Sequence, residues 1–221
     1  MARLVLDGRA GETSNTNGET RAAMAFTLPH EVIDVLCKLG NADVILCNAG
    51  LDPCSQAHLQ DCQRKAQCDL VALGLWCDGV PCNYDRTDTM AVVSINLPGQ
   101  TGQYKPLRIP LVAFSRKDLS PNTFDDIMAV IAWSLRCLAA GVKPSARHDG
   151  SAWRQSGRKR KMAHGKLPLR AALVEVRGDW VMFAEVFKFP HFDLKTGCCW
   201  LCHTTPAQAS LAIPPTPGFG V

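Results

Sequence analysis

The stretch V-A-L-G-L-W-C-D-G-V, residues 71–80, decides the fold because an apolar run ends there in an aspartate followed by glycine. Apolar runs bounded by turn residues are typical of buried strands, so we predict a strand that ends near Asp78. A second run of this kind, V-E-V-R-G-D-W at 174–180, places Asp179 beside a glycine in the same way. Taken alone, Asp179 is more simply interpreted as a turn residue or as the N-cap of a helix starting at Trp180.

The residues around these two runs predict the remaining elements. Pro110 lies within one apolar run and indicates an edge strand or a bulge there. Two helices are expected before the first strand, near 32–39 and over 55–70, the second capped by Ser55. The other predicted elements are strands at 91–97, 107–114 and 171–177, a long helix from Asn122 to Ala140, and a helix at 180–188.

The order strand, strand, strand, helix, strand, helix predicts a mixed α/β sheet of the ribonuclease H-like kind, truncated and preceded by a helical extension. In that topology the first and fourth strands are neighbours and parallel, so Asp78 and Asp179 should lie close together. Neighbouring carboxylates repel each other unless a divalent cation neutralises them. We therefore expect Asp78 and Asp179 to be catalytic carboxylates that bind Mg²⁺ or Mn²⁺.

Several motifs carry a resemblance to known proteins. C-D-G-V-P (77–81), T-F-D-D-I…W-S-L (123–135), G-x-x-P-S-A-R-H-D-G (141–150), G-D-W and a distal C-x-x-C together resemble an uncharacterised multicopy protein family of dinoflagellates. The strand-end aspartate, G-D-W, F-P-x-F and C-x-x-C also resemble, more distantly, DDE transposases of the Tnp2 type. That resemblance implies a ribonuclease H-like fold with a cysteine-rich insertion after the second catalytic aspartate.

The same resemblance makes Asp78 the first catalytic carboxylate and Asp179 the second. The third acid of such an enzyme follows the cysteine insertion, but the sequence from His203 to Val221 contains no acidic residue. The missing third acid predicts that the chain is a catalytically incomplete copy of such an enzyme.

Other acids could substitute for the missing one. Glu185 is a candidate, although a solvated helix position explains it more simply. Asp125 and Asp126 begin the long helix, where a negative charge is favourable at a helix N-terminus without any catalytic role.

The C-x-x-C motif indicates a zinc site. Cys199 and Cys202 are spaced so that both thiolates can bind one Zn²⁺. The transposase resemblance favours His191 as a third ligand, and His203 is the candidate for the fourth. Chance spacing is the alternative, because the chain contains 11 cysteines.

A basic segment precedes the last predicted strand. The net charge of the chain is only +4, so affinity for nucleic acid would have to come from local clustering. A solvated loop and a nuclear localisation signal are the alternatives to phosphate contact. The candidate nucleic-acid-binding residues are Arg154, Arg158, Lys159, Arg160, Lys161 and Lys166.

The sequence further predicts how the chain is organised. No apolar run of about 18 residues occurs, and the N-terminus is too short and polar for a signal peptide, so we expect a nuclear or cytoplasmic protein without a membrane span. The expected regions are a disordered N-terminus (1–25), a helical accessory region (26–70), the ribonuclease H-like core (71–190), a zinc-binding segment (191–205) and a Pro-rich tail (206–221).

These patterns lead to one preferred function and two alternatives. The preferred function is a transposase-derived, ribonuclease H-like domain that binds nucleic acid, DNA rather than RNA, and is catalytically incomplete. The alternatives are an active metal-dependent polynucleotidyl transferase or nuclease, and a gene fragment without function. The sequence leaves the oligomeric state open.

Overall fold

The computed structural model describes residues 24–40, 42–81, 84, 89–101, 107–115, 123–153, 157–161 and 163–190. The chain divides into two compact units, Met1–Arg177 and Gly178–Val221. The first unit contains α1 (Pro29–Lys38), α2 (Ala42–Ile45), α3 (Pro53–Ala66), β1 (Leu70–Pro81), β2 (Thr89–Asn96), β3 (Arg108–Ser115), α4 (Thr123–Ala140), α5 (Arg158–Lys161) and all but the last residue of β4 (Arg170–Gly178). The second unit contains α6 (Trp180–Phe187).

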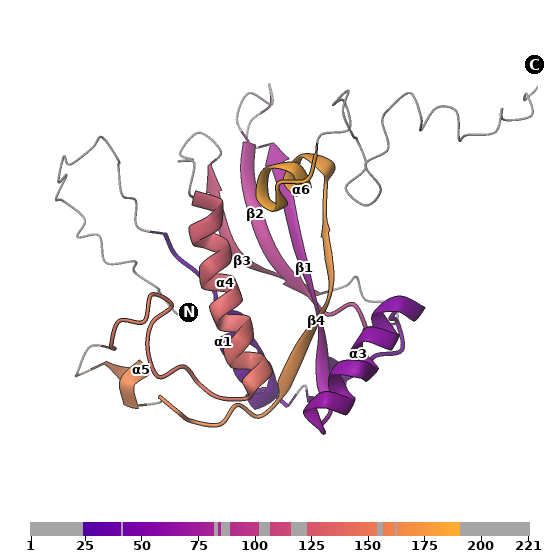
Figure 1. The fold of residues 1–221 in the computed structure, drawn as a ribbon, viewed down its shortest axis with the longest axis vertical. Coiled ribbons are helices and arrows are strands. Elements are labelled where there is room, and N and C mark those ends of the chain that lie inside the picture. Colours follow the sequence, from indigo (N-terminus) through magenta and orange to yellow (C-terminus); the bar gives the residue numbers. More distant parts are fainter. Residues whose placement is uncertain are drawn as a thin grey trace, which may run out of the picture. The chain divides into compact units, whose positions relative to one another are not determined.

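The centre of the first unit is an open four-stranded sheet with the order β3-β2-β1-β4 (Figure 1). Strands β1, β2 and β3 are antiparallel, and β4 lies beside β1 and runs parallel to it. Helix α4 connects β3 with β4. The predicted mixed α/β sheet, with antiparallel strands followed by a helix and a parallel strand, is therefore confirmed at this level.

The prediction from Pro110 is also confirmed. Strand β3 is an edge strand, where a residue without an N–H group is tolerated. Its pairing with β2 shifts register between Val93 and Ser94, and Ser94 is the residue opposite Pro110.

One face of the sheet packs against α1 and α4. Alternate residues of β1 point to opposite faces, and Val71 and Leu73 point to this one. They share a core with Ile33 of α1 and Leu138 of α4, and all four side chains are almost fully buried. Burial of each such aliphatic side chain contributes on the order of 1.5–3 kcal/mol, so α1 is an integral part of this layer.

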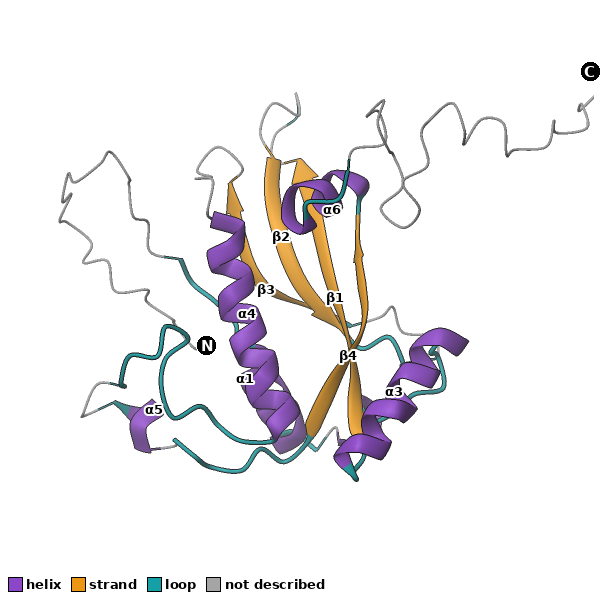
Figure 2. Cartoon of the chain, viewed as in Figure 1, coloured by secondary structure: helices purple, strands orange, loops and turns teal. Residues whose placement is uncertain are grey.

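The opposite face packs against α3, as Figure 2 shows. Leu70 and Ala72 of β1 point to this side and contact Leu59 of α3. Residues 26–70, expected from the sequence to be an accessory region, thus contribute helices to both hydrophobic cores of the sheet.

The start of α3 differs from the prediction. The N-cap is Asp52, whose Oδ1 accepts hydrogen bonds from the backbone N–H of Cys54 (2.9 Å) and of Ser55 (3.0 Å). The prediction of Ser55 as the cap was wrong because Pro53, which lacks an N–H group, occupies the first helical position. Ser55 lies inside the helix, and its hydroxyl donates to the carbonyl oxygen of Val174 at 3.4 Å.

None of the helices within the described ranges is both long enough and apolar enough to cross a membrane.

Candidate functional site

The two strand-end aspartates occupy different local environments. Asp78 is a half-buried residue of β1, opposite Val92 of β2. Asp179 directly follows β4 and caps α6, because its Oδ1 accepts a hydrogen bond of 2.7 Å from the backbone N–H of Met182. The simpler interpretation of Asp179 as an N-cap is thus confirmed. Asp78 belongs to the first compact unit and Asp179 to the second.

Cys77 is the nearest potential nucleophile in the sequence to Asp78. Its side chain is buried, and burial raises the pKa of the thiol to about 12. Because the thiolate is the reactive and metal-binding form of cysteine, Cys77 is an inert residue of the core at neutral pH.

The predicted zinc ligands His191, Cys199, Cys202 and His203 lie outside the described residues. Within the described ranges, no three or more His, Cys, Asp or Glu side chains are grouped so that they could bind a metal ion. The zinc site therefore stays a prediction.

The basic segment forms the short helix α5. Arg160, Lys161 and Lys166 are exposed, and none of them forms an ion pair inside the described part of the chain. Arg154 and the side chain of Arg158 lie outside the described residues.

Backbone hydrogen bonds hold this segment against the chain that follows α4. The N–H of Lys143 donates to the carbonyl oxygen of Gly165 at 2.7 Å, and the N–H of Leu167 donates to that of Gly141 at 2.9 Å. Val142 and Lys166 form an antiparallel bridge between these bonds. The pairing fixes Lys166 and Lys143 on a short ladder, so their side chains start from defined positions.

A tight turn at Arg147–Gly150 completes the connecting segment. The N–H of Arg147 donates to the carbonyl oxygen of Ser151, and Asp149 Oδ1 accepts the N–H of Ser151, each at 2.9 Å. Gly150 has a φ of 81°, which other residues rarely adopt. Trp153 follows the turn, and its Nε1–H donates to the carbonyl oxygen of Pro144 at 3.1 Å.

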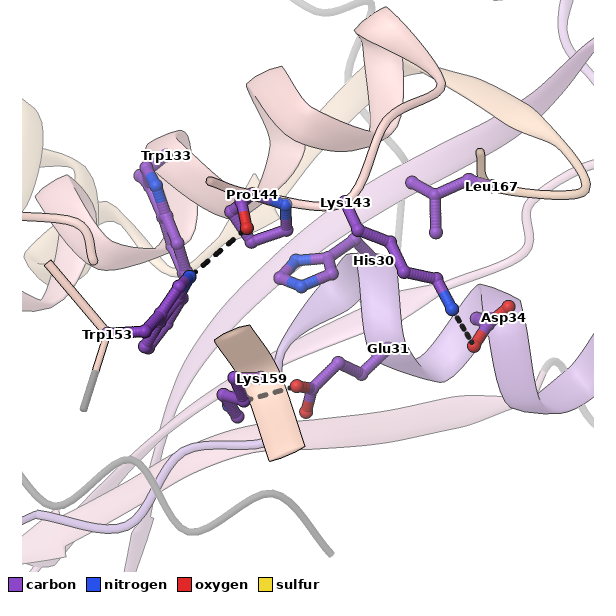
Figure 3. Close-up of a pocket in the computed structure, with 9 residues that line it drawn as sticks. All are labelled: His30, Glu31, Asp34, Trp133, Lys143, Pro144, Trp153, Lys159 and Leu167. Carbon is purple, nitrogen blue, oxygen red and sulfur yellow. Dashed lines mark hydrogen bonds and ion pairs between the residues drawn. The ribbon is translucent and has the colours of Figure 1, made fainter. Parts of the chain in front are cut away.

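These connections enclose a pocket of about 50 Å³, drawn in Figure 3. Helix α1 supplies three of its charged or polar side chains, α4 supplies a tryptophan, and the segment between α4 and β4 supplies the rest. The lining residues are His30, Glu31, Asp34, Trp133, Lys143, Pro144, Trp153, Lys159 and Leu167. Except for Lys159, none of them was among the candidate site residues expected from the sequence, because their positions meet only through tertiary packing.

His30 is a buried, neutral residue of this pocket. Its Nδ1 lies 2.7 Å from Ser134 Oγ, and its backbone N–H donates to the same oxygen at 3.2 Å. Burial, and then the positive charge of Lys159, lowers the pKa of His30 to about 4. The imidazole is therefore uncharged at neutral pH.

Asp34 is one of the two carboxylates that line the pocket. Its Oδ2 accepts hydrogen bonds from Lys38 (2.5 Å) and from Lys143 (3.1 Å). Burial raises the pKa of Asp34, but the bonds from the two lysines outweigh this and leave the pKa below its ordinary value. Asp34 is thus ionised, and the two lysines compensate its negative charge.

Lys159 differs from its neighbours in α5 because its amine points inward. Its Nζ is 2.9 Å from Glu31 Oε1, and the nitrogen is buried although 32% of the side chain is exposed. The contact is an ion pair without hydrogen-bond geometry, so Nζ makes no hydrogen bond in the described structure. The ammonium also lies 5.6 Å from the centre of the Trp153 ring.

No known protein family, characterised protein or solved structure matches this chain.

Proposed function

We propose that the chain is a transposase-derived, ribonuclease H-like module that binds nucleic acid and does not cleave it. The observation that carries this proposal is the set of exposed cations Arg160, Lys161 and Lys166, which form no ion pair within the described residues. Cations without a protein partner are free to contact phosphates.

The sheet supports the ribonuclease H-like part of the proposal. Strand β4 lies beside β1 and parallel to it, after the helix crossover through α4, which is the order expected for that fold. The carboxyl ends of β1 and β4 are therefore at the same edge of the sheet. Asp78 lies in the last part of β1, and Asp179 follows β4 directly in the sequence.

The carboxylates support the non-catalytic part of the proposal. Cleavage by two metal ions needs enough carboxylates to hold both ions. Asp179 already uses one oxygen to cap α6. We therefore expect neither Mg²⁺ nor Mn²⁺ to support cleavage by this chain.

The basic segment supports a contact with the nucleic acid backbone, DNA in the first place. Each cation that contacts a phosphate of duplex DNA releases counterions, so the logarithm of the binding constant falls with the logarithm of salt concentration by about 0.9 per contact. This dependence distinguishes phosphate contact from apolar association.

The test is fluorescence anisotropy of a labelled duplex, titrated with the full chain at several salt concentrations. Wild type should bind more weakly as salt rises. A variant with Arg160, Lys161 and Lys166 all changed to alanine should bind more weakly at low salt and show a shallower salt dependence, by up to about 0.9 for each lost contact.

The matched control removes exposed cations elsewhere. Arg64 and Lys65 on α3 are 77% and 76% exposed, but both form ion pairs with Asp61. Their double alanine variant should keep the wild-type salt dependence. If both variants lose the same amount of affinity and of salt dependence, the effect is one of net charge in general, and the proposed surface is overturned.

A further inference from the structure

We propose that the pocket between α1 and the segment that follows α4 binds a small oxyanion, with inorganic phosphate or a terminal phosphate monoester as its chemical type. The inference goes beyond the proposed function, since the pocket and the exposed cations are made of different side chains. Only α5 contributes to both, through Lys159 on the inner side and Lys161 on the outer side.

The size of the pocket restricts the ligand. A site for one water molecule needs about 10–15 Å³ by the same measure, so about 50 Å³ holds roughly three to five water-sized groups. A tetrahedral oxyanion, with its five heavy atoms, has this size.

The charged side chains that line the pocket are paired: Lys143 balances Asp34, and Lys159 balances Glu31. Lys38 lies outside the lining and is 60% exposed, but it shares Asp34 with Lys143. With Lys38 included, the three lysines and two carboxylates leave a net charge of +1, which favours an anion.

Hydrogen-bond donors are available where the ligand would lie. Lys159 Nζ is buried and ion-paired with Glu31 at 2.9 Å, but it makes no hydrogen bond with the described residues, so its N–H groups are available to a ligand or water. Lys143 uses one of its three N–H groups on Asp34. In Figure 3 the side chain of Lys143 extends to Asp34, and the amine of Lys159 faces Glu31.

His30 adds a neutral polar group to the lining. Its Nδ1 lies 2.7 Å from Ser134 Oγ, and its backbone N–H donates to the same oxygen. In the tautomer with the proton on Nε2, the imidazole donates without adding a positive charge to a pocket that already contains two ammonium groups.

The tryptophans strengthen these contacts. Trp153 is 8% exposed and lies within 6.3 Å of Trp133, measured between ring centres. Both rings line the pocket. Apolar walls keep water away from the charged donors, and hydrogen bonds to charged groups are stronger where the local dielectric is low.

Isothermal titration calorimetry of the full chain with sodium phosphate, at constant ionic strength, tests the proposal. Wild type should show saturable binding. Lys159→Gln removes one charged donor and should weaken binding about tenfold or more. Lys65→Gln, at an exposed position of α3 outside the pocket, should leave the affinity unchanged.

Two results would overturn the inference. One is wild-type protein without saturable binding below about 10 mM phosphate. The other is an equal affinity in wild type and Lys159→Gln. If Lys159→Gln does not fold, Lys159→Arg, which keeps the charge, takes its place: the phosphate-dependent change in tryptophan fluorescence must persist in this variant. Tighter binding of the zwitterion glycine than of phosphate would contradict the choice of ligand.

The source of the phosphate is distinguished by two further titrations. A 5′-phosphorylated dinucleotide that binds more tightly than inorganic phosphate would assign the site to a nucleic acid end. Binding of free phosphate alone would assign it to a small anion in solution. An unphosphorylated dinucleotide should not bind the pocket, and if it competes with phosphate the oxyanion chemistry is wrong.

Discussion

His30 Nδ1 lies 2.7 Å from Ser134 Oγ, although the two residues are 104 positions apart in the chain. The contact joins α1 to α4 beneath the pocket. Both residues are buried, Ser134 completely. The first helix of the described chain is thus tied to the core by a polar contact as well as by apolar packing.

The buried His30 predicts a loss of stability in mild acid. Its pKa is about 4 in the folded chain, against 6.5 for an ordinary histidine. Between these two values the unfolded chain binds a proton that the folded chain does not. The stabilisation is complete above about pH 6.5 and falls, by on the order of 3 kcal/mol, as the pH approaches 4.

Urea unfolding of wild type and His30→Gln at about pH 7 and about pH 4.5 measures this term. The variant should lose less stability between the two values, because its amide does not titrate. Asp34 is present in both proteins, so the stability that is lost when Asp34 is protonated at low pH cancels in the comparison. The control His58→Gln, at an exposed position of α3, should behave as wild type. An identical pH dependence in His30→Gln and wild type would contradict the account of His30.

Arg170 links the ends of two helices. Its Nε–H donates to the carbonyl oxygen of Ala139 at 2.6 Å and its Nη1–H to that of Ala66 at 3.2 Å. The last carbonyls of a helix have no partner within the helix, so Arg170→Met should lower the free energy of unfolding by about 1–3 kcal/mol. Arg170→Lys should not restore it, because an ammonium lacks the fork that reaches both carbonyls. If urea unfolding finds Arg170→Met as stable as Arg136→Met, a variant at an exposed position of α4, the stabilising role of Arg170 is refuted.

Gly74 leaves room for a polar contact across the sheet. Asn96 Nδ2 donates to Glu175 Oε1 at 2.9 Å, and a Cβ atom on Gly74 would lie 2.6 Å from that carboxylate oxygen. Gly74→Ala should therefore destabilise the chain by about 1–3 kcal/mol. Gly79→Ala on the same strand is the control, since its Cβ would meet only a methyl group at 3.3 Å. Equal thermal stabilities of the two variants would show that the sheet adjusts to the methyl group at no cost.

The zinc prediction concerns residues outside the described ranges and needs a chemical measurement. Atomic emission on purified protein should find close to one zinc per chain, about the occupancy of a structural site. The double variant Cys199→Ser, Cys202→Ser should lose it. Cys54 and Cys68 are exposed free cysteines, and their double serine variant should keep the metal. The same background zinc in all three proteins would leave the C-x-x-C motif without a metal.

Much of the fold could be predicted because its main elements have a local signal. Apolar runs with turn residues at their ends predicted β1 and β4, and helical spacing with a terminal glycine predicted α4. The role of α1 could not be predicted, because the burial of Ile33 depends on Val71 and Leu73 in a distant strand.

The candidate site was less predictable. A run of charges predicted exposed cations, which holds for Lys161, but nothing local indicates that Lys159 points inward to Glu31. The pocket combines residues from His30 to Leu167, and only the packing of α1 against α4 brings them together. Asp179 shows the opposite case, since its role as a helix cap is local and could be read from G-D-W.

Binding without cleavage is the central claim, and one assay tests it most directly. A labelled DNA is incubated at low salt with enough full-length chain to bind it, in Mg²⁺ and separately in Mn²⁺. Anisotropy reports binding, and a denaturing gel of the same samples reports cleavage. The account predicts bound, intact DNA in wild type, Asp78→Asn and Asp179→Asn, the last of which keeps a good helix cap. Metal-dependent cleavage by wild type that Asp78→Asn abolishes would contradict it.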